Sequence, residues 1–149
     1  MFVPHKQRIR AALPLALIEH IGSTSVPGLP AKPIIDIVVG VDDVTAEEDY
    51  LVPLLAAGYL LRVREPGHRL VRTPELDVLV HVYQRDDSAV RNYLLFRDRL
   101  RASASDRELY ATTKRRLIAQ GFDDMNAYSD AKTEAIAAIM ARARGESGK

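Results

Sequence analysis

The sequence predicts a single α/β domain of the α+β type, in which a mixed β-sheet is formed first and is backed by helices from a helical C-terminal half. Two observations lead to this prediction. β-Branched runs punctuated by Pro and Gly fill about the first 85 residues, whereas the remainder has the periodicity of amphipathic helices. Residues 34–39 (Ile-Ile-Asp-Ile-Val-Val) form a nearly continuous apolar run, which is typical of a central strand covered on both faces.

Composition and charge exclude several classes of protein. The 149 residues are 47% hydrophobic and 28% charged, which excludes disordered and collagen-like chains and suits one domain over residues 1–149. Because 21 Lys and Arg residues face 20 Asp and Glu residues, there is no strong nucleic-acid signal. The chain has no cysteine, no signal-peptide pattern and no apolar run of ~18 residues. We therefore expect a cytoplasmic protein without membrane association. The sequence does not indicate the oligomeric state.

The first half is expected to contain two helices and five strands. Pro14 should stop a short helix over residues 6–13, because proline lacks the amide that would continue it. Thr45 and Glu48 match a capping box for a helix that runs to Ala57. The expected strands cover residues 16–21, 34–39, 59–64, 68–72 and 77–83, and the third and fourth form a hairpin across Glu65, Pro66 and Gly67.

The second half is expected to contain three helices, over residues 88–101, 105–121 and 127–143. Ser88 should cap the first of them, and Ser105 with Glu108 forms a second capping box. This half is therefore predicted to contribute helices alone.

The stretch over residues 20–36 carries the most specific chemistry. A strand enters the turn Gly22-Ser23-Thr24-Ser25, and the chain returns as the buried strand that bears Asp36. Glycine lets backbone N–H groups approach an anion, and the hydroxyls add donors. Phosphate donors beside a metal-binding acid suit a nucleoside triphosphate with Mg²⁺. We expect Asp36 in the C-terminal half of its strand, facing a cleft lined by Gly22 and Ser23; the alternative is a structural turn with Asp36 accepting backbone bonds in the core.

Other candidates come from the next strand and from basic segments. Alternation along residues 77–83 places Asp77 and His81 on the same face, so both are candidates to complete a site at Asp36. His20 either contacts a bound phosphate or anchors the turn. Basic residues of the hairpin and of the helix over 91–101 are explained most often by a solvated face.

These motifs resemble the GrpB-like family, an uncharacterised bacterial group with a nucleotidyltransferase-like fold. The family pattern His-Ile-Gly-Ser-Thr-Ser-Val-Pro-Gly-Leu corresponds to residues 20–29, and Ala-Lys-Pro-Ile-Ile-Asp-Ile corresponds to residues 31–37. The resemblance continues at residues 79–82, where the family usually has His-Leu-His-Val, and at residues 95–101. It covers about residues 15–142.

The resemblance implies a nucleotidyltransferase that moves a nucleoside monophosphate from a triphosphate to an unknown acceptor with Mg²⁺. It implies catalytic roles for Asp36, Asp77 and His81, with Asp36 and Asp77 as the metal ligands. Phosphate binding would then fall to the remaining candidates, namely His20, Gly22, Ser23, Thr24, Ser25, Lys32, Arg69 and Arg97.

One departure from the nucleotidyltransferase pattern concerns the second acid. The pattern has two acids separated by one residue, but here the position of the second acid, two residues after Asp36, is occupied by Val38. Two-metal transfer needs several carboxylates around the ions. The alternative function is therefore a non-catalytic nucleotide- or partner-binding module. A third hypothesis is a purely interaction-based domain that uses the basic helix over 91–101 against an acidic partner.

Overall fold

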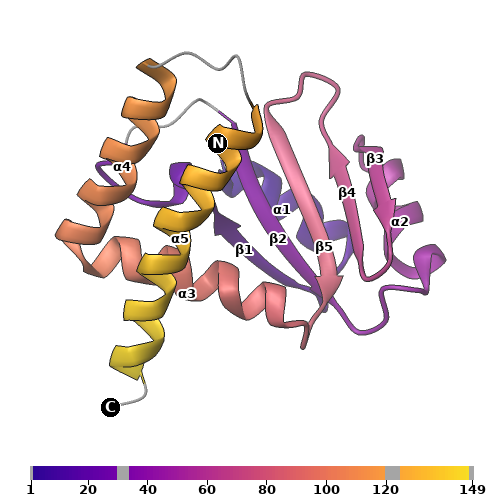
Figure 1. Ribbon diagram of the computed structural model, residues 1–149. Helices are drawn as coiled ribbons and strands as arrows, with labels where there is room; N and C mark the ends of the chain where they lie inside the picture. Colours follow the sequence, from indigo (N-terminus) through magenta and orange to yellow (C-terminus); the bar gives the residue numbers. More distant parts are fainter. Residues whose placement is uncertain (1, 30–33, 120–124, 148–149) are drawn as a thin grey trace. The chain divides into compact units, whose positions relative to one another are not determined.

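The computed structural model describes the backbone of residues 2–29, 34–119 and 125–147, and the side chains of residues 2–29, 34–116 and 133–145. The chain forms two compact units (Figure 1). The first comprises Met1–Ser25 and Ala31–Leu94, and the second comprises Val26–Pro30 and Leu95–Lys149. That the whole chain acts as a single domain stays a prediction.

The first unit is built on a five-stranded mixed sheet with the strand order β1-β2-β5-β4-β3 (Figure 1). β2 and β5 are parallel, and all other neighbouring strands are antiparallel. The α/β class, the five strands and the hairpin are thus confirmed, and the predicted strand ends differ by at most two residues. The strands are β1 (Leu17–Ile21), β2 (Ile35–Val41), β3 (Leu60–Glu65), β4 (His68–Arg72) and β5 (Val78–Gln84).

Helices α1 (Phe2–Ala12) and α2 (Glu47–Ala56) cover one face of this sheet, which lies in front of them in Figure 1. Val78, Val80 and Val82 point into this core and are fully buried, so the predicted alternation of β5 is confirmed. Each buried valine stabilises the fold by about 1.5–3 kcal/mol. The first helix begins four residues earlier than predicted, because Pro4 lies in its first turn, where an amide has no helical partner.

The opposite face of the sheet is covered by the first part of α3 (Ser88–Ala102). Val90 of this helix packs on Ile21 of β1 and Val38 of β2. Both faces of the central strand β2 are therefore buried, as its apolar sequence predicts.

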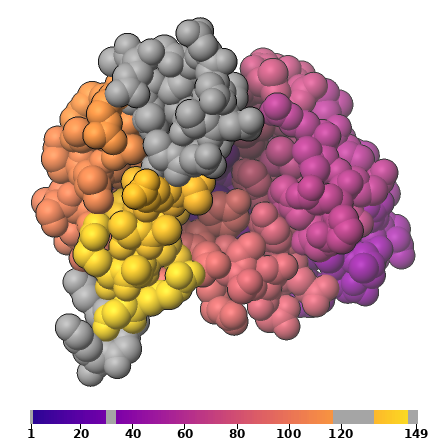
Figure 2. All heavy atoms as spheres, viewed as in Figure 1, coloured from indigo at the N-terminus to yellow at the C-terminus, as the bar shows by residue number. Residues whose placement is uncertain are grey.

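Strand β3 forms an edge of the sheet and is exposed at most of its residues, in the magenta part of the surface in Figure 2. Its register with β4 shifts between Leu61 and Val63, and it carries Arg62 and Arg64. A bulge and charged side chains disfavour pairing of an edge with another chain.

The second unit packs the end of α3 with α4 (Ala104–Ala119) and α5 (Met125–Ser147). The buried Asp106 accepts from Arg99 Nε at 2.7 Å and from Arg142 Nε at 2.8 Å. The hydrogen bonds from Arg142 are the largest cause of the lowered pKa of Asp106. No helix in the described parts of the chain is long and apolar enough to span a bilayer.

The predicted caps of the three helices are wrong in detail. Thr45 donates through its amide and hydroxyl to Asp43 Oδ1, at 3.0 and 2.6 Å, and α2 begins after Ala46 without a side-chain cap. The amide of Ala89 donates to Asp87 Oδ1 at 2.8 Å, so Asp87 replaces Ser88 as the cap of α3.

For α4, Ser103 Oγ accepts from the amide of Asp106 at 3.2 Å and replaces the predicted Ser105. In α3 and α4 a residue able to cap lies one or two positions upstream of the predicted one, and the helix uses it. The predicted end at Gly121 lies outside the described residues, and α4 is described to Ala119.

Candidate functional site

The carboxylate of Asp36 lies directly against the turn at Gly22. Ile21, the last residue of β1, pairs with Asp36 near the start of β2. Gly22 has φ +75°, and a Cβ added to it would lie 2.8 Å from Asp36 Oδ2. Only glycine combines this backbone conformation with such a close approach. Asp36 is the second residue of β2, so its expected place in the C-terminal half is wrong, because the strand extends to Val41.

The residues after Gly22 form a short 3-10 turn, Ser23–Ser25. Ser25 is buried and donates its hydroxyl to the carbonyl of Gly22 at 2.5 Å. Thr24 Oγ1 lies 2.9 Å from His20 Nε2, whose ring stacks on Phe2 of α1 at 4.7 Å. His20 thus lies on the α1 face of the sheet, and Asp36 lies on the α3 face. Thr24 and Ser25 stabilise the conformation of the turn.

A chain of polar side chains leads away from Asp36 across the sheet. Asp36 Oδ1 lies 3.3 Å from Nε2 of His81 on β5, and His81 Nδ1 lies 3.4 Å from Nε2 of His68 on β4. His68 Nδ1 lies 2.7 Å from Glu65 Oε1. The side chains of Asp36, His81 and His68 are 29%, 17% and 14% exposed, and that of Glu65 is 58% exposed. The chain therefore connects a half-buried carboxylate with one in solvent.

Aromatic rings flank the two histidines. His68 stacks on Tyr83 with ring centroids 4.6 Å apart, and the ring centroids of His81 and Tyr93 of α3 are 5.9 Å apart. Burial is the largest cause of the raised pKa of Tyr83. The prediction of the site missed His68 and Glu65, because alternation fixes faces only within one strand, and the register of β4 with β5 places His68 on the face of His81.

Val38 takes the position of the missing second acid and is enclosed by apolar groups. It lies two residues after Asp36 on the same face, packs with Ile21 and Val90, and is 0% exposed. An unpaired carboxylate at this position would be buried at a large cost in free energy. Strand β2 therefore supplies one acid to the site.

The other predicted site residues lie elsewhere. Asp77 precedes β5, and its Oδ1 accepts from the hydroxyl of the buried Thr73 at 2.5 Å. Arg69 points to the α2 face and donates to Glu47 at 2.5 Å. In the second unit, Arg97 donates to Asp98 at 3.0 Å, and Lys32 lies outside the described residues. The structure thus brings together Gly22, Asp36 and His81 from the predicted set.

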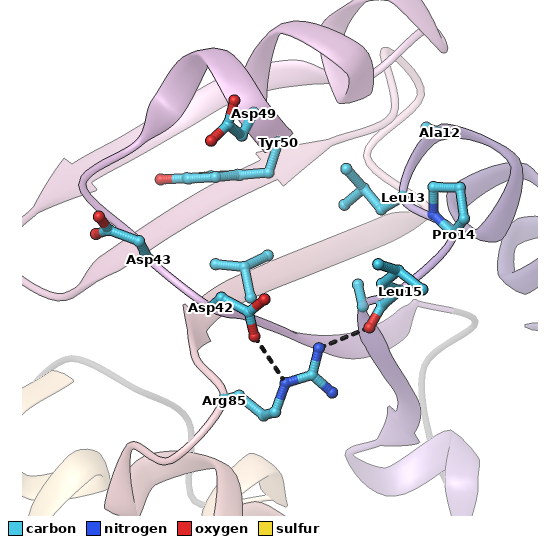
Figure 3. Close-up of a pocket in the computed structure, with 11 residues that line it drawn as sticks. Ala12, Leu13, Pro14, Leu15, Asp42, Asp43, Asp49, Tyr50 and Arg85 are labelled. Carbon is cyan, nitrogen blue, oxygen red and sulfur yellow. Dashed lines mark hydrogen bonds and ion pairs between the residues drawn. The ribbon is translucent and has the colours of Figure 1, made fainter.

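A pocket of about 290 Å³ lies at the other end of β2 (Figure 3). Its rim carries Asp42, Asp43 and Asp49, and Arg85 there donates to Asp42 at 3.3 Å and to the carbonyl of Leu15 at 2.6 Å. Three carboxylates against one paired guanidinium repel phosphate groups. The pocket is therefore unsuited to a nucleotide, and the Asp36 end of β2 is the better candidate.

Comparison with known proteins identifies the family. Residues 1–142 match the GrpB protein family. This chain belongs to that family. A UPF0157 protein of Streptomyces coelicolor is 64% identical over 143 residues, which are 95% of this chain and 77% of that protein. The crystal structure of the conserved protein GrpB from Enterococcus faecalis has a TM-score of 0.83 at 31% identity, and the match covers 99% of this chain and 93% of that one.

The GrpB fold is also similar to that of nucleotidyltransferases. The structure of the Cid1 poly(U) polymerase with MgGTP bound has a TM-score of 0.53 at 16% identity, over 75% of this chain and 38% of that one. At this identity the likeness concerns the fold alone. The nucleotidyltransferase-like fold expected from the family motifs is confirmed.

The residues around Asp36 can coordinate Mg²⁺ only together with the phosphate oxygens of a bound polyphosphate. Mg²⁺ usually keeps several waters and is bound by one or two carboxylates plus substrate phosphates. Asp36 supplies one carboxylate beside the glycine turn, and within the described segments there is no group of three His, Asp or Glu side chains able to hold a metal ion. The donor set suits a single ion that arrives with a nucleotide, and it lacks the second carboxylate of a two-metal centre.

Proposed function

We propose that this protein binds a nucleoside triphosphate as its Mg²⁺ complex at the end of β1 and the start of β2. The phosphates would lie on the turn at Gly22 and Ser23, and Asp36 would be the protein's carboxylate ligand to the ion. The observation that carries this proposal is the packing of Asp36 Oδ2 against Gly22, where a Cβ would lie only 2.8 Å away. This packing places a glycine turn of the kind that binds phosphate directly beside a carboxylate of the kind that binds Mg²⁺.

The placement of the other acids favours a role in nucleotide binding over a role in two-metal catalysis. Val38 is fully buried among apolar side chains, and Asp77 is bonded to Thr73. A site with one carboxylate can hold a triphosphate whose own oxygens complete the coordination of the ion. The fold shared with a polymerase that binds MgGTP supports the class of ligand.

Nucleotidyl transfer is the second candidate function, and the contact between His81 and Asp36 favours it. In such a transfer the acceptor hydroxyl oxygen attacks the α-phosphorus, and the bond from that phosphorus to the bridging oxygen breaks. Pyrophosphate leaves with the bonding electrons, and the acceptor's proton passes to a base. Asp36 and His81, 3.3 Å apart, are the groups in the site that can accept it.

Binding is tested by calorimetric titration with ATP, GTP, CTP and UTP, each with and without Mg²⁺. Asp36→Asn keeps the shape of the side chain but removes the charge, so we expect at least tenfold weaker binding of the Mg²⁺ complex. Asp49→Asn is the matched control, because the Asp49 side chain is exposed on α2 and accepts no hydrogen bond among the described residues. Equal affinity of wild type and Asp36→Asn, with both folded, would contradict the proposal.

Transfer is separated from binding by measuring pyrophosphate release from the bound triphosphate in the presence of candidate hydroxyl acceptors. Release that is lost in both Asp36→Asn and His81→Asn supports the second candidate. Tight Mg²⁺-dependent binding without release supports a binding module.

A further inference from the structure

We propose that the pocket at the Val41 end of β2 is a second binding site, which takes a short aliphatic diamine whose two ammonium groups meet the acidic rim. The site is formed within the first unit alone, by the end of α1, the loop after it, the end of β2, α2 and Arg85. It lies at the opposite end of β2 from Asp36, so the inference goes beyond the proposed function and does not depend on it.

Buried apolar side chains form the walls of this pocket. Leu13, Val41 and Tyr50 line it and are 6%, 8% and 2% exposed. The hydroxyl of Tyr50 donates to the carbonyl of Val44 at 2.6 Å, which holds the ring in one orientation. In Figure 3 this ring lies across the pocket from Arg85. Such walls suit an alkyl chain, and an aromatic ring also attracts a cation near its face.

The wall between α1 and β1 is formed before a ligand arrives. Arg10 Nη1 donates to the carbonyls of Pro14 and Ala16, at 2.8 and 2.6 Å. Arg85 Nη2 donates to the carbonyl of Leu15 at 2.6 Å, and of the two arginines it alone lines the pocket. Because three successive carbonyls are held, the loop loses little freedom when a ligand binds.

The charge of the rim suits a ligand with two positive charges. Its three aspartates, Asp42, Asp43 and Asp49, carry three negative charges. Arg85 contributes one positive charge and donates to Asp42 at 3.3 Å, so three minus one leaves two negative charges on the rim. Hydrogen bonds from the side chain and then the amide of Thr45 lower the pKa of Asp43, which is therefore ionised at neutral pH. Two ammonium groups balance the remaining charge, whereas a monoamine leaves one carboxylate unmatched.

The pocket does not suit a metal ion or a large ligand. Within the described parts of the chain no three His, Asp or Glu side chains could hold one metal ion together, so the rim carboxylates do not converge on a single point. Its volume of about 290 Å³ is at the lower limit of small-molecule pockets, which span about 300–1,000 Å³. A short diamine meets both conditions, because an apolar chain of a few carbons separates its two charges.

The first experiment compares putrescine, butylamine, butanediol and Mg²⁺ by calorimetric titration at low ionic strength. Butylamine lacks one ammonium group of putrescine, and butanediol has the same chain length but no charge. We expect putrescine to bind about two- to fivefold more tightly than butylamine, which is the effect of one ion pair with an exposed carboxylate. We expect no binding of butanediol and no displacement of putrescine by equimolar Mg²⁺.

The second experiment removes the rim charges one at a time. Asp43→Asn keeps the Oδ1 acceptor that Thr45 uses, and Asp49→Asn removes a charge from an exposed position on α2. We expect each variant to bind putrescine about two- to fivefold more weakly. Glu48→Gln is the matched control, because it removes the same charge from the neighbouring exposed residue, which does not line the pocket. Asp49→Asn remains a control for nucleotide binding, because the pocket and the Gly22 turn lie at opposite ends of β2.

The third experiment locates the ligand by NMR. Addition of putrescine should shift the amide signals of residues 12–16, 41–43, 49–50 and 85 most strongly, because these residues line the pocket. Shifts that are absent, or that are distributed over acidic residues outside the pocket, overturn the proposal.

The remaining outcomes separate the diamine from other occupants. Equal losses of affinity in Glu48→Gln and Asp49→Asn, with both folded by thermal melting, overturn the proposal, because only the overall charge then matters. Displacement of putrescine by equimolar Mg²⁺ overturns it in favour of a metal site. Tighter binding of acetyl-lysine amide than of putrescine overturns it in favour of a lysine side chain from a partner protein. Each of these results holds whether or not the protein binds a nucleotide.

Discussion

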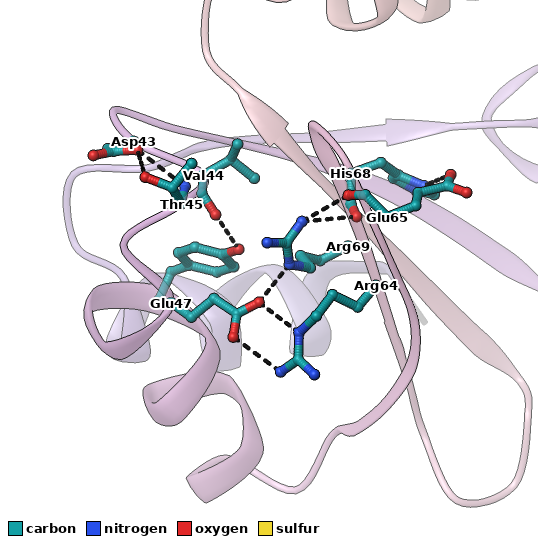
Figure 4. A network of polar contacts seen from close by, with 9 residues as sticks. Asp43, Val44, Thr45, Glu47, Arg64, Glu65, His68 and Arg69 are labelled. Atoms are coloured by element: carbon teal, nitrogen blue, oxygen red, sulfur yellow. Dashed lines mark hydrogen bonds and ion pairs between the residues drawn. The ribbon is translucent and has the colours of Figure 1, made fainter.

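Two polar networks begin at consecutive residues of β4 and run over opposite faces of the sheet. On the α2 face, Glu47 accepts from Arg69 at 2.5 Å and from Arg64 Nε and Nη2 at 2.8 and 2.9 Å (Figure 4). The hydrogen bonds from Arg64 and Arg69 lower the pKa of Glu47 to about 2. On the α3 face, His68 begins the chain that ends at Asp36.

The difference between the networks lies in their donors. Arginine is always protonated, so every contact of Glu47 has its hydrogen, and the network ties α2 to the hairpin. The histidine chain joins two carboxylates through two rings that carry one hydrogen too few when neutral. The α2 face therefore has a network of fixed charge, which suits structure, and the α3 face has one whose hydrogens can be rearranged, which suits chemistry. The following changes test this contrast, from the largest expected effect to the smallest.

Introducing a second acid at Val38 should disrupt the apolar part of the α3 face. Val38→Asp places an unpaired carboxylate where the native side chain is 0% exposed, and we expect it to lower the free energy of unfolding by about 3–5 kcal/mol. Val52→Asp is the matched control, because Val52 is 60% exposed, and its effect should lie within about 0.5 kcal/mol. Urea denaturation measures both. A stable Val38→Asp protein would show that this face tolerates a second acid.

Adding a methyl group at Gly22 should separate the turn from Asp36. In Gly22→Ala the new Cβ is strained by the positive φ and also contacts Asp36 Oδ2. In Gly28→Ala the φ of +82° causes the same kind of strain, but no atom lies within 4 Å of the new Cβ. The conformational cost, about 1–2 kcal/mol, is common to the two variants. We expect Gly22→Ala alone to lose additional stability and nucleotide affinity. Equal effects in denaturation and titration would show that the close approach is unimportant.

On the α1 face, His5 should make stability depend on pH. His5 Nδ1 lies 2.8 Å from the hydroxyl of Tyr59, and burial followed by the charge of Arg8 lowers the pKa of His5 from 6.5. Since the unfolded chain then binds a proton more readily, stability is fully present above about pH 6.5 and is lost as the pH falls toward the lowered pKa. Urea midpoints between pH 7.5 and 5.5 should show this loss in wild type, and less of it in His5→Gln.

The smallest expected effect concerns Glu47, because its network is partly exposed and is screened by salt. Its pKa is lowered from 4.5 to about 2, so its stabilisation is present above about pH 4.5 and is lost as the pH falls toward 2. Glu47→Gln should flatten this part of the stability profile at low ionic strength. The two profiles should converge in 1 M salt, and a difference that persists there would argue against an electrostatic origin.

Local patterns predicted much of the fold. The alternation of Val78, Val80 and Val82, the apolar run of β2 and the turn at Pro66 and Gly67 depend on neighbouring residues, so they are visible in the sequence. Helix starts were less accurate, because several residues near each start can act as a cap. The choice of Asp87 and Ser103 depends on the loops that lead into α3 and α4.

The sequence by itself determined that a glycine turn rich in hydroxyls precedes a strand with a single acid, and that His81 shares a face of its strand with the neighbouring odd-numbered residues. Only the tertiary structure decided which of these groups meet. Pairing of β1 with β2 places Asp36 against Gly22, the diagonal register of β4 and β5 adds His68, and packing of α3 encloses Val38. The physical reason is that alternation fixes the face of a side chain within its own strand. Its neighbours across the sheet depend on the strand order and register, which contacts distant in sequence determine.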